Sequence, residues 1–350
     1  MYYVNENVKN CVRIFPEQGR YDYHRYDMNE NPEGLPKWFV EEVLSEITPQ
    51  FLAIYPEPDR FLKKYAEYIG VSYDNVLTTN GSDMAIRYLL EVFCEKGKEV
   101  LTVTPSFEMY AVNCSILGLK HKAVSYEKDL SIDVAKIVAA ITEDTDIVVL
   151  LNPNNPVGNV YSQEEFEWIV EKAEACGAIV IVDEAYHYFY RETFLREAIS
   201  RKNVVILRTF SKLFSLAACR LGIIISNPEI IGYVKKSRLT FEANAIALLF
   251  AERLIEHPEL IEELIATAKE GKQYLMEELG KRGYQVRDCK GNYVFIRPKS
   301  EPKELEKRLK DRKILIKTYG NELLRDYIRV STGSRETMAY FIENFLEEDC

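Results

Sequence analysis

The chain has 350 residues, of which 47% are apolar and 29% are charged, and its formal net charge at pH 7 is −10. This length and composition fit a globular protein that buries the core of one large domain or two. The acidic balance argues against binding of nucleic acid or anionic membranes through a basic face, and no apolar run approaches the ~20 residues that cross a bilayer.

Several common chemistries are disfavoured by the motifs that are missing. Seven cysteines without a CxxC pair, and no signal peptide, predict reduced thiols in a cytoplasmic protein. Four scattered histidines predict that no metal is bound. The patterns GxGxxG, GxxxxGK[ST], GxSxG and HExxH do not occur, which disfavours dinucleotide, P-loop, serine-hydrolase and zinc-protease chemistry.

The first 75 residues predict turns and short helices. Residues 1–36 are rich in Tyr, Asn and Pro, which is typical of irregular backbone. Apolar residues recur at helical spacing in 38–47 and 61–69. Between these helices, residues 50–59 carry Tyr55 among prolines, and we expect an irregular crossing segment there.

From residue 76 to residue 225, apolar runs alternate with amphipathic stretches. Strands are predicted at 100–103, 122–125, 147–151, 179–182, 204–207 and 223–225, and helices at 84–93, 106–117, 132–140, 162–175 and 192–200. Such alternation is typical of an α/β protein, with a mostly parallel sheet flanked by helices.

The alternation stops near residue 243. A long helical region with weak breaks at Pro258 and Gly271 is expected to run to residue 281. Strands then follow at 285–297, 314–317 and 327–331, and helices at 301–310 and 335–348. We therefore predict a large α/β domain at 48–250. A smaller α+β domain would be built from both chain ends, 1–47 and 251–350.

Polar residues follow the short run 78–79 and three of the predicted strands. A glycine turn at 81–83 opens a helix, residues 152–158 hold Asn and Pro, residues 183–186 begin with Asp183, and residues 208–222 carry Lys212. Because the carboxyl ends of parallel strands share one edge of a sheet, these segments predict a ligand crevice. Each segment alone also fits an ordinary cap or turn, but those explanations do not account for their joint occurrence in this order.

Pyridoxal phosphate requires this set of side chains. A lysine amine condenses with its aldehyde, and a carboxylate keeps its ring nitrogen protonated so that the ring withdraws electrons. A phenol and an amide hydrogen-bond its 3′ oxygen. Backbone N–H groups at a helix start, with hydroxyls and an arginine, hold its phosphate.

On these residues the sequence resembles the fold-type I pyridoxal-phosphate-dependent aminotransferases of class I/II, and among them most the histidinol-phosphate aminotransferases. The segments that carry the resemblance are 29–32, 55–56, 80–83, 152–158, 182–186, 209–222 and 328–333. They span nearly the whole chain. The resemblance implies the fold type I architecture, with a mostly parallel sheet flanked by helices and a smaller α+β domain.

The resemblance also implies roles for individual residues. Lys212, Asp183 and Tyr186 would be the catalytic residues: the lysine binds the cofactor and shuttles the proton, and the carboxylate pairs with the ring nitrogen. Tyr186 and Asn155 would bond the 3′ oxygen. The remaining implied cofactor contacts are Ser82, Asp83, Thr209, Ser211 and Arg220 at the phosphate, Phe107 on the ring, and Tyr55 at the partner subunit's phosphate site. Arg329 would clamp a substrate carboxylate, and Asn31 is expected near the substrate.

Three positions depart from the family pattern. The segment Ala217-Ala218-Cys219 replaces a usual Ala-Gly, Met84 replaces an acidic residue, and Val157 replaces a threonine. These departures leave the cofactor chemistry intact. They weaken the match to histidinol phosphate as the substrate.

The implied activity is transamination by a ping-pong cycle between glutamate/2-oxoglutarate and a second pair such as histidinol phosphate/imidazole acetol phosphate. The alternative is an amino-acid-phosphate decarboxylase similar to threonine-phosphate decarboxylase, which motifs alone do not separate. The resemblance further implies a homodimer with shared active sites. A ligand-sensing domain of a transcription regulator is disfavoured because no basic DNA-binding segment precedes residue 30, and a nicotinamide oxidoreductase because the glycine fingerprint is absent.

Overall fold

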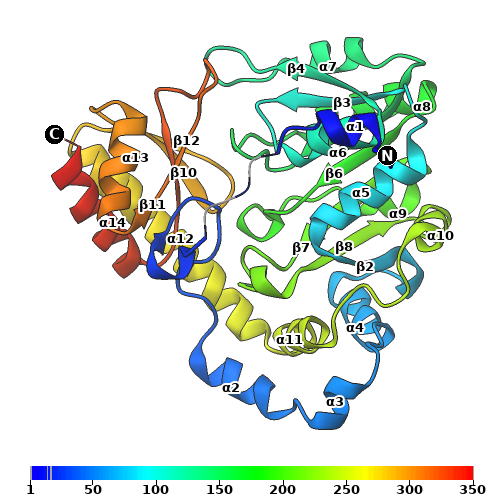
Figure 1. Ribbon diagram of the computed structural model, residues 1–350, viewed down its shortest axis with the longest axis horizontal. Helices are drawn as coiled ribbons and strands as arrows, with labels where there is room; N and C mark the ends of the chain where they lie inside the picture. The colour runs from blue at the N-terminus through cyan, green and yellow to red at the C-terminus, as the bar shows by residue number, and fades with distance from the viewer. Residues whose placement is uncertain (1, 14, 16–17, 350) are drawn as a thin grey trace.

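A seven-stranded sheet, seen on the right in Figure 1, is the largest sheet of the computed structural model, which describes residues 2–13, 15 and 18–349. The strand order is β2-β8-β7-β6-β5-β3-β4. The strands are β2 Val76–Asn80, β3 Glu99–Thr104, β4 Lys120–Ser125, β5 Thr145–Leu151, β6 Ile179–Asp183, β7 Val204–Thr209 and β8 Leu221–Ser226. Strand β8 is antiparallel to both neighbours, and the other pairs are parallel. The predicted, mostly parallel sheet is confirmed.

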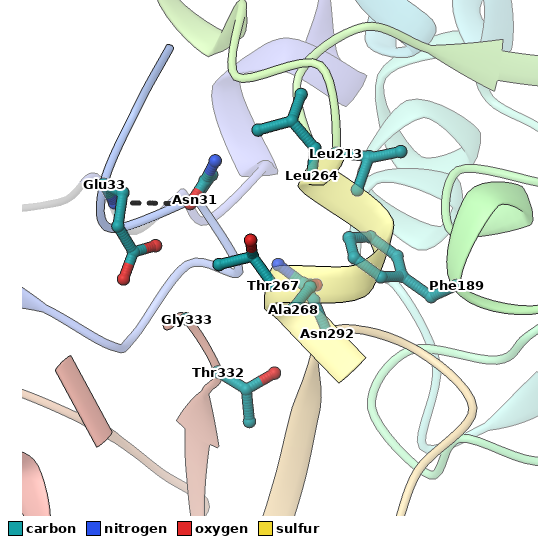
Figure 2. A pocket seen from close by; sticks show the side chains of 10 residues that line it. All are labelled: Asn31, Glu33, Phe189, Leu213, Leu264, Thr267, Ala268, Asn292, Thr332 and Gly333. Carbon is teal, nitrogen blue, oxygen red and sulfur yellow. Dashed lines mark hydrogen bonds between the residues drawn. The ribbon is translucent and has the colours of Figure 1, made fainter. Parts of the chain in front are cut away.

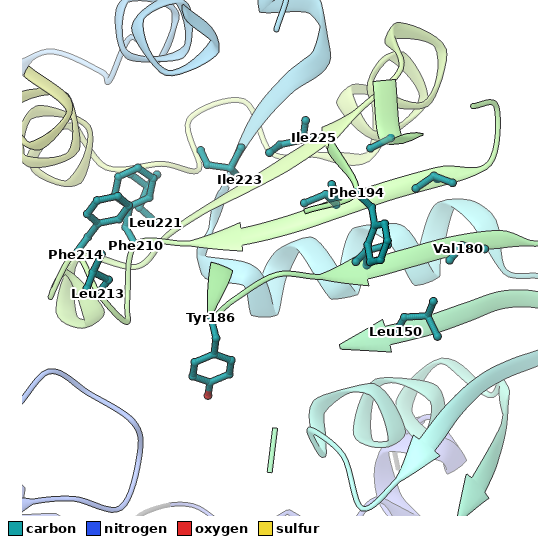
Figure 3. Packing of buried hydrophobic residues seen from close by; sticks show 14 of the residues in the cluster. Leu150, Val180, Tyr186, Phe194, Phe210, Leu213, Phe214, Leu221, Ile223 and Ile225 are labelled. Carbon is teal, nitrogen blue, oxygen red and sulfur yellow. The ribbon is translucent and has the colours of Figure 1, made fainter. Parts of the chain in front are cut away.

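Alternate residues of each strand bury their side chains on opposite faces of this sheet. In β6, Val180 and Val182 join one core cluster and Ile181 joins the other. This alternation explains why the strands read as continuous apolar runs, since both faces are covered. Figure 3 shows part of the first cluster, in which Phe210 and Phe214 pack beside Leu221 at the end of β7.

Helices cover both faces of the sheet. On one face lie α5 Gly81–Phe93, α6 Met109–Leu117 and α10 Pro228–Ser237. Helices that contribute to the other core cluster are α2 Lys37–Ser45, α4 Asp59–Ile69, α7 Val134–Ala140, α8 Gln163–Ala175, α9 Leu195–Ser200 and α11 Ala245–Glu256. Helix α8 begins with a capping box, in which the Ser162 hydroxyl accepts from the Glu165 N–H and the Glu165 carboxylate accepts from the Ser162 N–H.

A second, four-stranded antiparallel sheet has the order β12-β13-β10-β9. Its strands are β9 Gln285–Asp288, β10 Tyr293–Arg297, β12 Lys317–Thr318 and β13 Ile328–Ser331, and it is accompanied by α12 Pro258–Lys281, α13 Pro302–Asp311 and α14 Arg335–Glu348. Beside it, β1 His24–Arg25 pairs with β11 Ile314–Leu315. Tyr26 shares a core cluster with residues of α12, β10, β13 and α14. Both chain ends therefore contribute here, and the predicted boundaries 48–250 stay a prediction.

Some predicted elements differ from the structure. The run 285–297 is a hairpin of β9 and β10 rather than one strand, because Gly291 and Asn292 lie in its turn. The crossing segment contains a short helix, α3 Pro49–Ala53, capped by Thr48. The helical region breaks at Pro258, but α12 continues through Gly271.

The remaining described elements include α1 Glu6–Asn10 at the start of the chain. No helix among the described residues is long and apolar enough to cross a membrane. The six described cysteines are unpaired, and Cys350 lies outside the described residues.

Gly271 is required where α12 touches the loop after β13. A Cβ at this position would lie 1.9 Å from the Gly333 carbonyl oxygen. We predict that Gly271→Ala lowers the free energy of unfolding by about 1–3 kcal/mol through overpacking. Gly280 lies in the same helix and a Cβ there meets nothing within 4 Å, so Gly280→Ala should be neutral or stabilising by up to ~1 kcal/mol. Urea unfolding of the two variants checks this, and equal effects would contradict it.

Candidate active site

A cavity of about 130 Å³ opens at the edge of the sheet where β2, β5, β6 and β7 end. Its lining includes Ser82, Asp83, Phe107, Asn155, Asp183, Tyr186, Thr209, Ser211, Lys212 and Arg220. The structure thus brings together most of the residues that the sequence placed at a cofactor. Tyr55 is not among them.

The first turn of α5 forms one end of this cavity. The helix begins at Gly81, three residues before the predicted start at residue 84, and Asn80 makes no side-chain cap. Ser82 and Asp83 lie inside the first turn, where backbone N–H groups have no partner within the helix. The hydroxyls of Thr209 and Ser211, 3.0 Å apart, and the guanidinium of Arg220 face the same space. This donor set suits an anion such as a phosphate.

Two glycines allow Arg220 to reach the start of α5. A Cβ on Gly81 would lie 2.5 Å from Arg220 Nη2, and a Cβ on Gly222 would lie 2.5 Å from the Gly81 carbonyl carbon. Arg220 itself adopts a left-handed backbone with φ 55°, and its Nη2 donates to Asp83 at 2.9 Å. The backbone of β8 therefore packs directly against the helix start.

Asp183 ends β6 and is 3% exposed. Its Oδ2 accepts a hydrogen bond from the Tyr110 hydroxyl at 2.9 Å, and its Oδ1 accepts from the Ala185 N–H at 3.1 Å. Burial raises the pKa of the Asp183 carboxyl to about 6, although both hydrogen bonds oppose the rise. A buried carboxylate of this kind is poised to pair with a cationic ring nitrogen. Tyr110 was missed as a partner; its position three residues after Phe107, at a helix start, was the available signal.

Lys212 is anchored by buried neighbours on both sides. Phe210, Leu213 and Phe214 are 1–3% exposed, and the Phe210 and Phe214 rings stack at 4.6 Å. The Lys212 Nζ donates to the Met28 carbonyl at 2.9 Å. Burial lowers the pKa of the Lys212 amine to about 8, with a further contribution from the Arg329 charge. An amine that is neutral near this pH is a nucleophile.

The Tyr186 ring projects from the end of β6 away from the sheet (Figure 3). Its hydroxyl accepts a hydrogen bond from Asn29 Nδ2 at 2.8 Å, and the Lys212 Nζ lies 5.8 Å from its ring centre. Burial raises the pKa of the Tyr186 phenol to about 12, opposed by the Arg329 charge and the Asn29 hydrogen bond. The sequence motif 29–32 contains Asn29 but does not predict this contact.

Arg329 reaches the site from β13 of the second sheet. It is 6% exposed, its Nη1 donates to Asn155 Oδ1 at 2.7 Å, and its Nη2 donates to the Asp27 carbonyl. Its Nε is buried and has no hydrogen-bond partner. Among the described residues no carboxylate forms an ion pair with it. A buried guanidinium without a counter-ion is costly unless an anion joins it.

Asn31 is not among the residues that line the main cavity. Its Nδ2 donates to Ser215 Oγ at 2.7 Å. It lines a second cavity of about 40 Å³, shown in Figure 2, with Glu33, Thr332 and Gly333. This volume is close to that of one or two water molecules. The second cavity is therefore too small for a substrate, and Asn31 stays a predicted substrate contact.

Tyr55 lies away from the cavity of its own chain. Its side chain is 71% exposed, and its ring stacks on Phe241 with centroids 4.3 Å apart. It lines a different surface groove together with Ile54 and Leu248. One chain alone therefore does not bring Tyr55 to the predicted phosphate site.

A buried ion pair that sequence reasoning missed holds two of the site strands together. Glu184, which follows Asp183, accepts from Arg208 Nε at 3.0 Å and from Arg208 Nη2 at 2.8 Å. Their side chains are 0% and 3% exposed. Thr193 completes the network by donating to Glu184 at 2.7 Å. No group of three or more His, Cys, Asp or Glu side chains that could hold a metal occurs within the described part of the chain.

Comparison with known proteins identifies the family. The family described as "Aminotransferase class I and II" matches residues 26–345. The chain belongs to the class I and II aminotransferases. This membership confirms the predicted enzyme class, a transaminase that uses pyridoxal phosphate.

Relatives within this family agree. The chain is 32% identical to the histidinol-phosphate aminotransferase of Clostridium novyi over 316 residues, which is 89% of this chain and 88% of that protein. It is 31% identical over 350 residues to the enzyme of that name from Caldanaerobacter subterraneus subsp. tengcongensis, covering 99% and 98% of the two chains. The crystal structure of histidinol-phosphate aminotransferase from Sinorhizobium meliloti in complex with pyridoxal-5′-phosphate shares the fold. Its TM-score is 0.90 at 21% identity, with 99% and 98% coverage.

The side chains of this aminotransferase fit its cofactor. The uncapped first turn of α5 offers an anion-binding cradle. Asp183 offers a buried acceptor, and Lys212 offers an amine with a lowered pKa. An acid, an amine and an anion cradle on one cavity are the three groups that a phosphorylated pyridine aldehyde requires.

The raised pKa of Asp183 has a consequence for stability without cofactor. A carboxyl with an unfolded pKa of about 3.9 and a folded pKa of about 6 binds its proton more tightly when folded. Its ionised form therefore opposes folding above pH 6, and the effect fades as the pH falls toward 4. Asp183→Asn should stabilise the cofactor-free protein at pH 8 by about 2–3 kcal/mol and by much less at pH 4.5.

Thermal or urea unfolding at both pH values measures this difference. Glu184→Gln is the matched control, because it neutralises the adjacent carboxylate but leaves the Arg208 cation buried without a counter-ion. That variant should instead lose about 3–5 kcal/mol. A destabilised Asp183→Asn protein at pH 8 would show that the Asp183 charge is well compensated.

Proposed function

We propose that this aminotransferase transfers an amino group between glutamate/2-oxoglutarate and a second, phosphorylated pair, histidinol phosphate/imidazole acetol phosphate. The main support for a substrate with an anionic group is Arg329. This buried cation lies beside the proposed cofactor residue Asn155 and has no carboxylate partner among the described residues. A guanidinium binds a carboxylate or a phosphate through parallel hydrogen bonds. The names of the matched relatives support histidinol phosphate.

The cofactor would be held by the residues that line the cavity. The first turn of α5 with Ser82, Thr209, Ser211 and Arg220 would bind the phosphate. Asp183 would pair with the ring nitrogen and Phe107 would pack on the ring. Tyr186 and Asn155 would bond the 3′ oxygen. When bound, pyridoxal phosphate supplies an electron-withdrawing ring that stabilises negative charge on the substrate carbon.

The side chains of this chain provide the remaining chemistry. Lys212 Nζ, with a pKa near 8, can accept and return a proton at working pH. Asp183 would pair its carboxylate with the ring nitrogen and so maintain the electron-withdrawing character of the ring. Arg329, which donates to Asn155 Oδ1 at 2.7 Å, would hold the substrate anion next to the amide that is proposed to contact the cofactor.

Decarboxylation of an amino-acid phosphate is not favoured. The matched relatives with over 30% identity carry the name of an aminotransferase. The departures at Met84, Val157 and 217–219 are not among the residues that line the cavity, so they add no chemical group to it.

We further propose a homodimer whose active sites are shared. Tyr55 is exposed in one chain, and the exposed apolar side chains of Ile54 and Phe241 lie beside it. Exposed aromatic and aliphatic groups of this kind are typical of an interface. In a dimer with its two-fold axis at this surface, Tyr55 would lie at the phosphate end of the partner subunit's cavity. A cytoplasmic location is part of the same proposal.

The substrate assignment can be tested with purified enzyme. Histidinol phosphate and 2-oxoglutarate should yield glutamate, whereas threonine phosphate should release no CO2. The Lys212→Ala protein, which keeps the anion cradle but lacks the amine, should show no glutamate formation above background. If the wild type instead releases CO2 from threonine phosphate as fast as it forms glutamate, the proposed activity is wrong and the decarboxylase alternative is supported.

The shared-site proposal can be tested by subunit mixing. Lys212→Ala and Tyr55→Ala homodimers should each be severely impaired. In a mixed dimer one site carries both lesions and the other neither, so an exchanged equimolar mixture should recover about a quarter of wild-type activity. Sedimentation should give a dimer. A fully active monomer, or no recovery despite proven exchange, would contradict shared sites.

A further inference from the structure

Asn29 has a backbone conformation that few residues adopt, and both polar atoms of its side chain make hydrogen bonds. Its φ is 55° and it is 1% exposed. Its N–H donates to Ser331 Oγ at 2.8 Å, and its carbonyl accepts from Asn292 Nδ2 at 3.1 Å. The left-handed backbone is tolerated by asparagine better than by most residues. Asn29 is thereby fixed to the second sheet.

The orientation of the Asn29 amide follows from its partners. Ser331 Oγ receives the Asn29 N–H, so the serine hydrogen is free to be donated to Asn29 Oδ1, 3.1 Å away. The amide nitrogen must then face the other way, and Nδ2 donates to the Tyr186 hydroxyl at 2.8 Å. The reverse amide orientation would leave the Ser331 hydrogen without this acceptor.

This arrangement determines what Tyr186 can do. Because its oxygen already accepts a hydrogen bond, its own hydrogen is free to point into the cavity that it lines. We propose that Asn29 is a positioning residue that holds the Tyr186 hydroxyl as a hydrogen-bond donor toward the 3′ oxygen of the bound cofactor. This inference rests on the proposed role of Tyr186.

The segment that contains Asn29 also contacts two other side chains of the site, Lys212 and Arg329. Ser331 is two residues after Arg329 on β13, and both residues belong to the strand that Asn29 contacts. Met28, the neighbour of Asn29, accepts from Lys212 Nζ, and Arg329 donates to the Asp27 carbonyl. The three consecutive residues 27–29 thus contact Arg329, Lys212 and Tyr186 in turn.

An isosteric change separates this role from a structural one. In Asn29→Asp the new carboxylate cannot donate, so the Tyr186 hydroxyl would turn its hydrogen toward that carboxylate and away from the cofactor. In Asn29→Gly the backbone keeps its left-handed conformation without strain, and only the amide is lost. Neither substitution removes a residue that touches the cofactor.

The readout is the pH at which the visible absorption band of the bound cofactor changes. A donor to the 3′ oxygen favours the ionised oxygen and lowers that midpoint. Asn29→Asp should raise the midpoint by about 1–2 pH units, and Asn29→Gly should raise it by a smaller amount. Asn29→Gly should unfold at a somewhat lower temperature than the wild type, because the Ser331 hydroxyl loses its buried acceptor, and the midpoint is therefore read well below that temperature.

A double-mutant cycle with Tyr186→Phe decides the cause. In the phenylalanine background the Asn29→Asp shift should fall to less than half, because the hydroxyl that transmits it is gone. An equal shift in both backgrounds would show a through-space charge effect and overturn the inference, as would an unchanged midpoint in Asn29→Gly. If the wild-type protein with added cofactor shows no visible band, the proposed cofactor chemistry itself is wrong. If the band is present but the Asn29→Asp shift is the same with and without the Tyr186 hydroxyl, only the role of Asn29 is wrong.

Discussion

The active site depends on the buried ion pair between Glu184 and Arg208. These residues directly adjoin Asp183 at the end of β6 and Thr209 at the end of β7, so their hydrogen bonds fix the separation of the acid and the anion cradle. Both charges are almost fully buried, and such a pair holds only when its geometry and its additional hydrogen bonds are satisfied. Thr193 and the Phe194 N–H supply those bonds. Neither Glu184 nor Arg208 lines the cavity, so the ion pair supports the site without occupying it.

In the cavity, burial favours the neutral forms of the two reactive groups, Asp183 and Lys212. It raises the pKa of Asp183 and lowers the pKa of Lys212. The cations Lys212, Arg220 and Arg329 gather around the cavity, and within the described residues only Arg220 has a carboxylate at hydrogen-bond distance. The site therefore has an excess of positive charge in a chain whose net charge is −10. The negative charges of the cofactor phosphate and of the substrate would neutralise this excess. Without them, the repulsion between the cations makes the site electrostatically unfavourable.

Local patterns in the sequence were sufficient for the strands and for the residues that follow them. Apolar runs bounded by turn residues located β5, β6 and β7, and the order of the polar segments after them indicated the cofactor. The contacts of Tyr110, Asn29 and Arg208 could not be predicted in this way, because each joins positions that are 24 to 157 residues apart in the chain. The antiparallel direction of β8 was also hidden, since a buried strand reads the same in either direction. Gly271 resembled a helix break because a helix interior disfavours glycine, whereas here a neighbouring carbonyl leaves no room for a side chain.

The place of β8 in the sheet has a consequence for how the protein comes to be folded during synthesis. Strand β2 is an edge strand whose described hydrogen-bonded neighbour is β8, and β8 follows it by about 140 residues. Residues 76–80 leave the ribosome early, yet they have no place in the sheet until Leu221–Ser226 emerges and inserts between β2 and β7. Contacts of such long sequence separation form slowly, because a large loop must close first. The anion cradle, which combines Gly81 with Gly222, is accordingly among the last parts of the large sheet to assemble, and until then β2 exposes an unpaired edge that chaperones would have reason to protect.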